Sequence, residues 1–383
     1  MKILVLNYEY PPLGGGAGNI TKNISYNLAL NGNNVVVVTS WYNNLLENEK
    51  PIPNIEIIRL KSKRKHLYHS NPIEMFSWMK CAIKYLSEYL ISNKFDICLA
   101  NFSIPGGYVA LKLKKKFNLP YCILSHGHDI PWFYKRQMFI YHLILFVVIK
   151  SICKQSSLNF VQTEFMKQNI DKFLGEKLSS KNIIIPNGVE VFENLLSERE
   201  KEPFTVIFVG RFVQQKDPFT LLKALKQLKR MDIPFKLLMV GDGPLRNKME
   251  KYVEKNGLFT TTFTGWIPQE QVKSIYKKSH TIITPSRAEG MSIANIEALA
   301  AGVFLIATPV SGNKEMLACC NNGVLIENGN YNEIANQLQK FYFEQFLSKN
   351  FKAQDAAKQF TKQYSWKKIS ELYQNELEKV LAN

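Results

Sequence analysis

The chain has 383 residues, of which 46% are hydrophobic and 21% charged, as in ordinary globular proteins. Because a single core stops growing at roughly 250–300 residues, this length predicts two domains. The formal net charge of +17 favours anionic partners such as nucleic acid, an acidic membrane or phosphorylated substrates. The six cysteines have no metal-ligand or redox spacing, which predicts a reduced, cytoplasmic protein without a metal site.

Neither a secretory signal nor a membrane-spanning helix is expected. The apolar start, residues 2–7, is too short for a signal and runs directly into YEYPP. The longest apolar run, residues 138–149, is interrupted by His142 and falls short of the roughly 20 residues that a spanning helix needs.

In the first half of the chain, short apolar runs alternate with amphipathic stretches. The runs typical of strands are ILVL at 3, VVVVT at 35, IEIIRL at 55, FDICLA at 95, YCILS at 121, LNFVQ at 158 and NIII at 182. Runs that are apolar throughout indicate strands buried on both faces of a parallel sheet. Between the first two, Ile20, Ile24 and Leu28 recur at helical spacing, and Gly32 ends that helix. This alternation predicts a doubly wound, Rossmann-like domain.

A second alternating series follows a charged stretch at 193–203 that suits a linker. Its apolar runs are FTVIFVG at 204, FKLLMVG at 235, TTFTG at 261, TIIT at 281, VFLIAT at 303 and GVLIEN at 323. We therefore expect an α/β fold with domains at 1–195 and 196–365, followed by a helix at 366–383. In such sheets ligands bind beyond the carboxyl ends of the strands, so the loops there are the candidate sites.

The stretch SRAEGMSIANIEALAAG, residues 286–302, combines several features of a phosphate and sugar site. It follows an apolar strand, and a helix should begin near Ser292. Gly290 lets backbone approach a ligand, and the amides of Met291 and Ser292 stand at a positive helix end. Glu289 precedes the helix, and Glu297 lies on it in an apolar setting where a carboxylate needs a partner. The alternative is a capped helix with one solvated glutamate.

Other loops after predicted strands also carry polar residues. In VGRFVQQKD, Arg211 and Lys216 could bind phosphate oxygens, although both could simply be solvated. In SHGHD, His126 and Asp129 should face the ligand side, although a lone histidine is often structural. Ile267 in FTGWIPQEQ could cover a flat base. The glycine-rich PPLGGGAGNI could meet a phosphate or sugar or be a flexible turn, and VGDGP is interpreted as architecture.

Taken together, these motifs resemble those of family-4 retaining glycosyltransferases with the GT-B fold. The matching segments, in chain order, are GGGAG, HGHD, PNGV, GRFVQQKD, VGDGP, FTGWIPQEQ and EGMSIANIEALAAG. The resemblance covers essentially the whole chain. It implies two Rossmann-like domains facing across a cleft, with the last helix crossing back to the first domain.

The resemblance also implies a role for each candidate residue. Arg211 and Lys216 would hold the diphosphate of a nucleotide-diphospho-sugar, Glu297 the ribose hydroxyls, and Ile267 the base. The donor sugar would meet Glu289, together with Gly290 and the amides of Met291 and Ser292. From the first domain, Gly15 and Gly16 would approach the donor, and His126 and Asp129 would line the sugar and acceptor side. The Asp-x-Asp metal signature of the other major transferase fold is absent.

A membrane surface is a further expected partner. The segment 132–154 is rich in aromatic and apolar residues with basic ends, and residues 61–66 (KSKRKH) and 112–116 (KLKKK) are basic. Residues 1–195 carry 23 Lys+Arg and 13 Asp+Glu, a difference of +10. This pattern favours an anionic membrane and a lipid-linked acceptor. The alternative is a buried helix with solvated basic loops.

We therefore interpret the sequence as a retaining, metal-independent glycosyltransferase of surface polysaccharide or glycolipid biosynthesis. It should be cytoplasmic and peripheral on the inner face of the membrane, use a UDP-linked donor, and need no cofactor. The acceptor would be a glycan or a lipid-linked saccharide. Nucleic acid is not expected, because no motif of a known binding module is visible. The alternatives are a nucleotide-sugar epimerase on the same fold and a catalytically silent GT-B scaffold.

Overall fold

The computed structural model describes residues 1–67, 70–131, 133, 139–192, 199, 202–349 and 353–382. The chain forms two compact units, Met1–Gly188 with Trp366–Asn383, and Val189–Ser365. The predicted domain boundary at residue 195 lies outside the described residues, as does most of the predicted linker.

The first unit is built on an eight-stranded sheet with the order β3-β4-β2-β1-β5-β6-β7-β8. The strands are β1 (Lys2–Leu6), β2 (Asn34–Ser40), β3 (Asn48–Glu49), β4 (Ile55–Leu60), β5 (Ile97–Asn101), β6 (Tyr121–Leu124), β7 (Asn159–Val161) and β8 (Asn182–Ile184). All neighbours are parallel except the short β3, which pairs antiparallel with β4. Each predicted apolar run is a strand, so the expected parallel sheet is confirmed.

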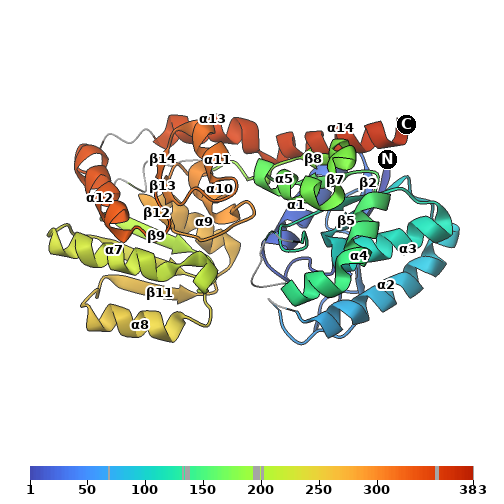
Figure 1. The fold of residues 1–383 in the computed structure, drawn as a ribbon, viewed down its shortest axis with the longest axis horizontal. Helices are drawn as coiled ribbons and strands as arrows, with labels where there is room; N and C mark the ends of the chain where they lie inside the picture. Colours follow the sequence, from blue (N-terminus) through green and yellow to red (C-terminus); the bar gives the residue numbers. More distant parts are fainter. Residues whose placement is uncertain are drawn as a thin grey trace. The chain divides into compact units, whose positions relative to one another are not determined.

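Helices cover both faces of this sheet (Figure 1). They are α1 (Gly16–Leu30), α2 (Pro72–Ser92), α3 (Tyr108–Phe117), α4 (Phe139–Gln155), α5 (Glu164–Leu174) and α14 (Trp366–Ala382). Because side chains alternate along a strand, Leu4 and Leu6 pack in one core with Trp78 of α2, whereas Ile3 and Val5 point to the other face.

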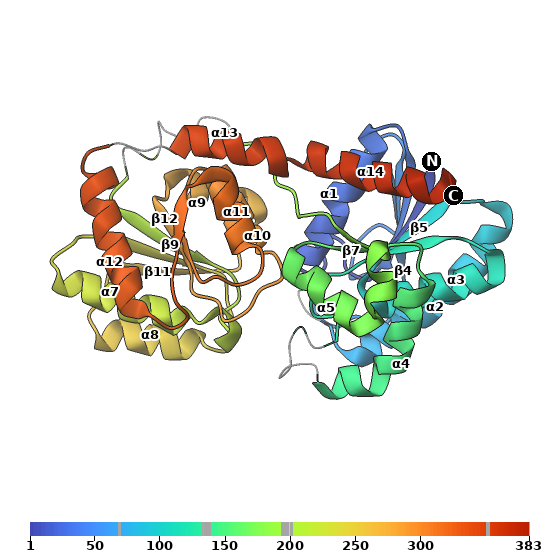
Figure 2. The ribbon, with the colours of Figure 1, turned by 45° about the horizontal axis from the view of Figure 1, so that its top comes forward.

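The last helix belongs to the first unit, as the sequence analysis expected. Helix α14 packs along α1 (Figure 2). Asn33 Nδ2 donates a hydrogen bond to Gln374 Oε1 at 3.2 Å, and the rings of Phe160 and Tyr373 lie 5.0 Å apart. The carboxyl-terminal segment thus completes the core of the amino-terminal unit.

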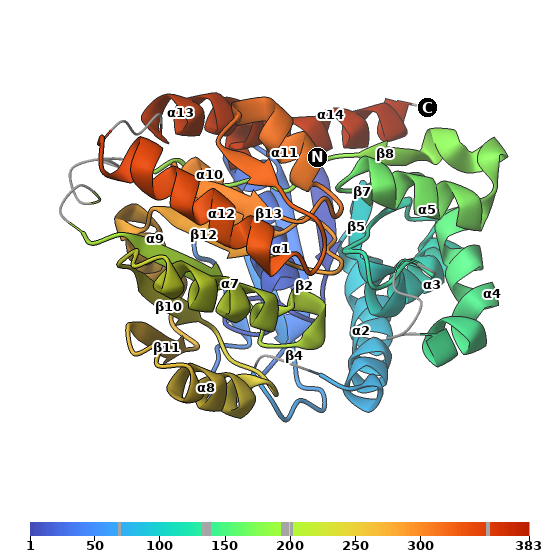
Figure 3. The ribbon, with the colours of Figure 1, turned by 60° about the vertical axis from the view of Figure 1, so that its left-hand side comes forward.

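The second unit has a six-stranded, fully parallel sheet with the order β11-β10-β9-β12-β13-β14. The strands are β9 (Thr205–Val209), β10 (Lys236–Val240), β11 (Thr261–Gly265), β12 (Thr281–Thr284), β13 (Phe304–Ala307) and β14 (Gly323–Leu325). One face carries α7 (Pro218–Arg230), α8 (Arg246–Lys255) and α12 (Tyr331–Phe341), with α12 beside α7 (Figure 3). The other carries α9 (Gln269–Lys278), α10 (Ile293–Ala300), α11 (Asn313–Cys320) and α13 (Ala353–Tyr364).

Glycines let the loops after β9 and β10 touch. Gly241 has a φ of +124°, and a Cβ there would lie 2.1 Å from the Gly210 carbonyl oxygen. A Cβ on Gly243 would lie 2.7 Å from the Phe212 oxygen. The VGDGP turn is therefore a packing element, as the sequence analysis interpreted it. No helix in the described ranges is both long and apolar enough to cross a membrane.

Candidate active site

Two loops of the second unit are held together by a buried ion pair. Lys216 ends a short 3₁₀ turn after β9, and its Nζ contacts Glu289 Oε1 in the loop after β12. Ser286 Oγ donates a hydrogen bond to the same carboxylate oxygen at 2.8 Å. The backbone is also joined, because Arg287 N donates to the Gln215 carbonyl oxygen at 2.8 Å. The structure thus brings together two residues predicted to meet one ligand, 73 positions apart in the sequence.

The pair leaves binding capacity on both partners. An ammonium group has three N–H donors, and only one is used on Glu289. The other Glu289 oxygen has no hydrogen bond to any described residue. Lys216 can therefore still donate to an anion while Glu289 accepts from a hydroxyl group.

The helix after this loop begins where the sequence predicted. Ser292 is the N-cap of α10, and its carbonyl oxygen accepts from Ile296 N at 3.1 Å. Gly290 and Met291 connect Glu289 to this helix end, so their backbone lies beside the ion pair. The positive end of the helix and the Lys216 ammonium together favour an anionic ligand.

A chain of buried polar side chains supports the loop from behind. Thr308 Oγ1 donates to the Ser286 carbonyl oxygen at 2.5 Å, and Asn313 Nδ2 donates to the Thr308 carbonyl oxygen at 2.9 Å. Asn295 Nδ2 on α10 then donates to Asn313 Oδ1 at 2.9 Å. Sequence reasoning missed these residues, although polar side chains next to apolar strands and helices were a visible signal. They hold Ser286, and through it Glu289, in a defined position.

Glu297 lies at a different contact, on α10 against α9. Its Oε1 accepts a hydrogen bond from Gln269 Nε2 at 2.9 Å. Burial raises the pKa of Glu297 to about 7, although the Gln269 hydrogen bond and the nearby Lys273 act in the opposite direction. Ile267 is half-buried two positions before Gln269, so the residues predicted for ribose and base lie on neighbouring segments.

Arg211 belongs to the same loop as Lys216 but makes no hydrogen bond or ion pair with Glu289. Its side chain is exposed, and no hydrogen bond or ion pair joins its guanidinium to the described residues. An exposed guanidinium can rearrange onto phosphate oxygens without breaking an existing contact.

In the first unit, the glycine-rich turn opens α1. Gly15 is the N-cap and Gly16 the first helical residue, and both are exposed. The first turn of α1 carries no acidic residue, and Gly14 N donates to the Leu67 carbonyl oxygen at 2.8 Å, which positions the turn. This helix end can therefore accept a negatively charged or hydroxylated group.

Asp129 shapes the loop that carries His126. Asp129 is 6% exposed, and its oxygens accept from Ser103 N at 2.9 Å, Ser125 Oγ at 3.0 Å and His126 N at 2.9 Å. These hydrogen bonds occupy the Asp129 carboxylate, which holds the backbone of His126 in place. Direct contact between Asp129 and an acceptor stays a prediction. Burial lowers the pKa of His126 to about 4, although Asp129 acts in the opposite direction.

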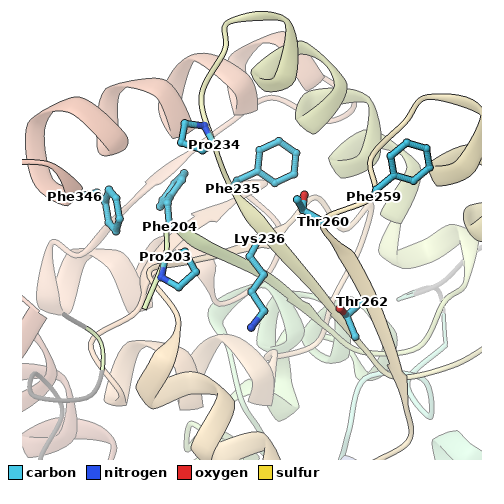
Figure 4. A pocket seen from close by; sticks show the side chains of 9 residues that line it. All are labelled: Pro203, Phe204, Pro234, Phe235, Lys236, Phe259, Thr260, Thr262 and Phe346. Atoms are coloured by element: carbon cyan, nitrogen blue, oxygen red, sulfur yellow. The ribbon is translucent and has the colours of Figure 1, made fainter. Parts of the chain in front are cut away.

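An apolar hollow of about 500 Å³ lies at the opposite edge of the second sheet (Figure 4). It is lined by residues at the amino ends of β9, β10 and β11, namely Pro203, Phe204, Pro234, Phe235, Lys236, Phe259, Thr260 and Thr262, together with Phe346. The predicted site residues follow the carboxyl ends of the strands, so this hollow is separate from them.

Solved structures with the same fold are glycosyltransferases of the GT-B class. Sucrose-phosphate synthase from Thermosynechococcus elongatus superposes with a TM-score of 0.84 at 20% identity, covering 100% of this chain and 99% of that chain. HepE of Anabaena, solved with UDP and glucose, has a TM-score of 0.75 at 17% identity and covers 99% of both chains. The fold of this protein is therefore GT-B.

Sequence comparison then defines the family. The group 1 glycosyl transferase profile matches residues 195–360, and the Glycosyltransferase Family 4 profile matches residues 14–191. The chain belongs to these family-4-like group 1 glycosyltransferases, and it is a glycosyltransferase. This confirms the resemblance found in its motifs.

Two relatives illustrate its position in the family. The glycosyltransferase MJ1178 of Methanocaldococcus jannaschii is 28% identical over 370 residues, which are 96% of this chain and 95% of that protein. TuaC of Bacillus subtilis, a glycosyltransferase named for teichuronic acid biosynthesis, is 27% identical over 57% of this chain and 54% of its own length.

The raised pKa of Glu297 predicts a pH dependence of donor binding. If its carboxylate accepts hydrogen bonds from ribose hydroxyls, protonation removes an acceptor, so affinity is full above the pKa and lost as the pH falls through about 7. Between pH 8 and pH 6 the donor Kd should rise roughly tenfold, as the ionised fraction falls. Calorimetry with a nucleotide-diphospho-sugar measures this. Glu297→Gln should bind more weakly at pH 8 and be flat with pH, and a variant that kept the wild-type profile would refute the assignment.

Removing the side-chain charge of Arg211 and removing that of Lys216 should affect the stability of the protein differently. Arg211→Ala should weaken donor binding by roughly 10- to 100-fold, the loss of a charge-assisted hydrogen bond, and leave thermal stability unchanged. Lys216→Ala should weaken binding and also destabilise the fold by up to ~3 kcal/mol, because Glu289 stays buried without its counter-charge.

The matched control is Lys216→Met combined with Glu289→Gln. This double variant should recover the stability lost in Lys216→Ala but not the donor affinity. Chemical denaturation and donor binding are measured on the wild type, the two single variants and the double variant. These measurements separate the effect on stability from the effect on donor affinity. Normal donor affinity in either single variant would contradict the phosphate-binding roles.

Proposed function

We propose that this glycosyltransferase transfers a sugar, with retention of configuration, from a UDP-linked donor to a glycan or lipid-linked acceptor. The observation that carries the proposal is the Lys216–Glu289 pair beside the amino end of α10, because it offers a cation to a phosphate group and a carboxylate oxygen to a sugar hydroxyl. The UDP bound by HepE supports the choice of nucleotide. The name of TuaC supports a place in surface polysaccharide or glycolipid biosynthesis.

The proposed donor pose follows the contacts in the second unit. Arg211 and Lys216 bind the diphosphate, the α10 amino end adds the amides of Met291 and Ser292, and Glu289 accepts from the donor sugar. Glu297 binds the ribose next to Ile267. Gly15, Gly16 and His126 of the first unit contact the sugar or the acceptor.

The proposed chemistry is a same-face substitution at the anomeric carbon. The bond from that carbon to the phosphate oxygen breaks, and a bond to the acceptor oxygen forms on the same face. The acceptor proton passes to the leaving phosphate oxygen. Arg211 and Lys216 stabilise the charge that develops on the diphosphate, which is the task a metal ion performs in other transferases. We therefore propose that neither a metal ion nor a cofactor is required.

Product analysis tests the reaction and the two alternative functions. Incubation with a panel of UDP-sugars and lipid-linked or free glycans should give a product whose linkage, read by proton NMR, keeps the donor's anomeric configuration. Turnover should persist with EDTA present. An inverted product would sink the retaining proposal, and loss of turnover that magnesium or manganese restores would refute metal independence. Interconversion of donor sugars without an acceptor would identify an epimerase, and donor binding without any turnover a silent scaffold.

We further propose that the protein acts as a peripheral protein on the cytoplasmic face of the membrane, through α4. The amino-terminal half of α4 exposes five apolar side chains, 48–77% accessible, namely Phe139, Ile140, Leu143, Ile144 and Val147. The buried residues of α4, among them His142 and Ile149, lie on the other side of the helix. The alternative of a buried helix therefore holds for one side of α4 and does not hold for the side that carries these five residues. Lys150 and Lys154 lie in the carboxyl-terminal half of α4, whereas the basic residues predicted at the start of the segment, Lys135 and Arg136, lie outside the described residues. An exposed apolar helix face on a basic protein suits an anionic bilayer surface.

The basic run at 61–66 is less available to lipid than its sequence suggested. The Arg64 guanidinium is nearly buried, and it donates to the carbonyl oxygens of His66 and Leu67. Lys61 is paired with Glu47. Lys63 and Lys65 are exposed and remain candidates for lipid contact.

Liposome flotation tests the membrane face. Binding to anionic vesicles should exceed binding to neutral ones and weaken with salt. Leu143→Ser, Ile144→Ser and Val147→Ser combined should abolish it, because each exposed apolar residue contributes roughly 1.5–3 kcal/mol on burial. Ile91→Ser, at a comparably exposed apolar residue on α2, is the control and should bind normally. Equal binding by the α4 variant would reject α4 as the docking face.

A further inference from the structure

Three fully buried polar residues of the first unit meet at the carboxyl ends of its central strands. Asn7 follows β1, Asn101 ends β5, and Thr21 lies on α1, the helix that follows the glycine-rich turn. Asn7 Nδ2 donates to Thr21 Oγ1 at 2.7 Å, and Thr21 Oγ1 lies 2.8 Å from Asn101 Oδ1. No sequence motif pointed to them, and the proposed reaction gives them no role.

This cluster reaches the imidazole of His126. His126 Nε2 lies 3.0 Å from Asn101 Oδ1, and the ring packs against Phe102 with centroids 4.7 Å apart. The loop itself is fixed by the bond from His126 N to Asp129. The imidazole is thus held by the hydrogen bond at Nε2 and by a tilted ring contact with Phe102.

The orientation of the Asn101 amide is determined by its third partner. Asn101 Nδ2 donates to the Leu6 carbonyl oxygen at 3.3 Å. Exchanging the amide nitrogen and oxygen would place two acceptors, Oδ1 and the Leu6 oxygen, against each other. Asn101 therefore presents its oxygen to His126, and because an amide oxygen only accepts, the proton lies on His126 Nε2.

We infer that Asn101 is a positioning residue that holds His126 as the neutral Nε2–H tautomer, so that its Nδ1 accepts a hydrogen bond from a sugar hydroxyl. Thr21 joins the same arrangement to α1, so the glycine-rich turn and the His126 loop are aligned by one set of hydrogen bonds. The role toward a sugar rests on the proposed function, whereas the tautomer does not. Burial lowers the pKa of His126, so the imidazole orients a hydroxyl and is a weak base.

The tautomer is measured directly by nitrogen-15 NMR of histidine-labelled protein. The chain has six histidines, and His126→Gln identifies the signals of His126. At pH 7 the wild type should show a protonated Nε2 and an unprotonated Nδ1 for His126, unchanged down to pH 5. A protonated Nδ1 or an imidazolium at pH 7 would overturn the inference.

Asn101→Asp tests the effect on catalysis. A carboxylate beside Nε2 favours the imidazolium, which protonates Nδ1 and removes the acceptor. The ratio of variant to wild-type kcat/KM should fall roughly tenfold at pH 6.5 and recover at pH 8.5, with KM for the donor changing less than kcat. The ratio cancels any pH dependence that Glu297 gives to both proteins. A ratio that does not vary with pH would overturn the positioning role.

Two further variants control for folding and for the proposed function. Asn101→Ser leaves a smaller side chain that adds no charge, so it should lower activity equally at all pH values. Asn101→Asp combined with His126→Gln should lose the pH-dependent component, because the titrating ring is gone. If the wild type shows the expected tautomer but transfers no sugar to any acceptor, the proposed function fails and the tautomer assignment stands.

Discussion

The ion pair between Lys216 and Glu289 is the contact around which the second unit's site is arranged. It joins the loops after β9 and β12, which parallel pairing places at the same edge of the sheet. Neither residue could be buried alone, because an unpaired charge in the interior costs several kcal/mol. Together they keep an ammonium group and a carboxylate oxygen beside the amino end of α10, and these groups have the chemistry to bind an anion and a hydroxyl group.

Both units support their site loops in the same physical way. In the second unit, Thr308, Asn313 and Asn295 hold the loop that carries Glu289, and in the first, Thr21 and Asn101 hold His126. Buried amides and hydroxyls are costly unless every hydrogen bond is made. A satisfied chain of this kind therefore permits one arrangement of the loop, whereas apolar packing would permit several. The side chains of both loops are therefore already held in position before any ligand binds.

Burial acts in opposite directions on the two titrating groups of greatest interest. It raises the pKa of Glu297 and lowers that of His126, because in each case it disfavours the charged form. The consequences differ, because the imidazole of His126 is kept neutral at neutral pH, whereas Glu297 changes its protonation state near pH 7. The strong positive charge of the molecule is left to exposed residues such as Arg211, Lys63 and Lys65, which can meet phosphate groups or lipid without first breaking a buried contact.

The sequence by itself determined the two parallel sheets, the helix that begins after Ser292 and the membership in the family. Apolar runs, glycines and motif order are local signals that can be recognised in the sequence. A parallel strand that is buried on both faces must be apolar along its whole length, so it leaves a clear pattern. Only the tertiary structure decided which side chains are exposed: the Arg64 guanidinium is nearly buried and hydrogen-bonded, Lys63 is exposed, and α4 exposes an apolar face. It also decided which side chains meet: Asp129 holds the backbone of His126, and Asn101 contacts both Thr21 and His126. Thr21 and Asn101 are 80 residues apart in sequence. Hydrogen-bond partners and solvent exposure depend on which distant segments meet, and no local pattern in the chain records that.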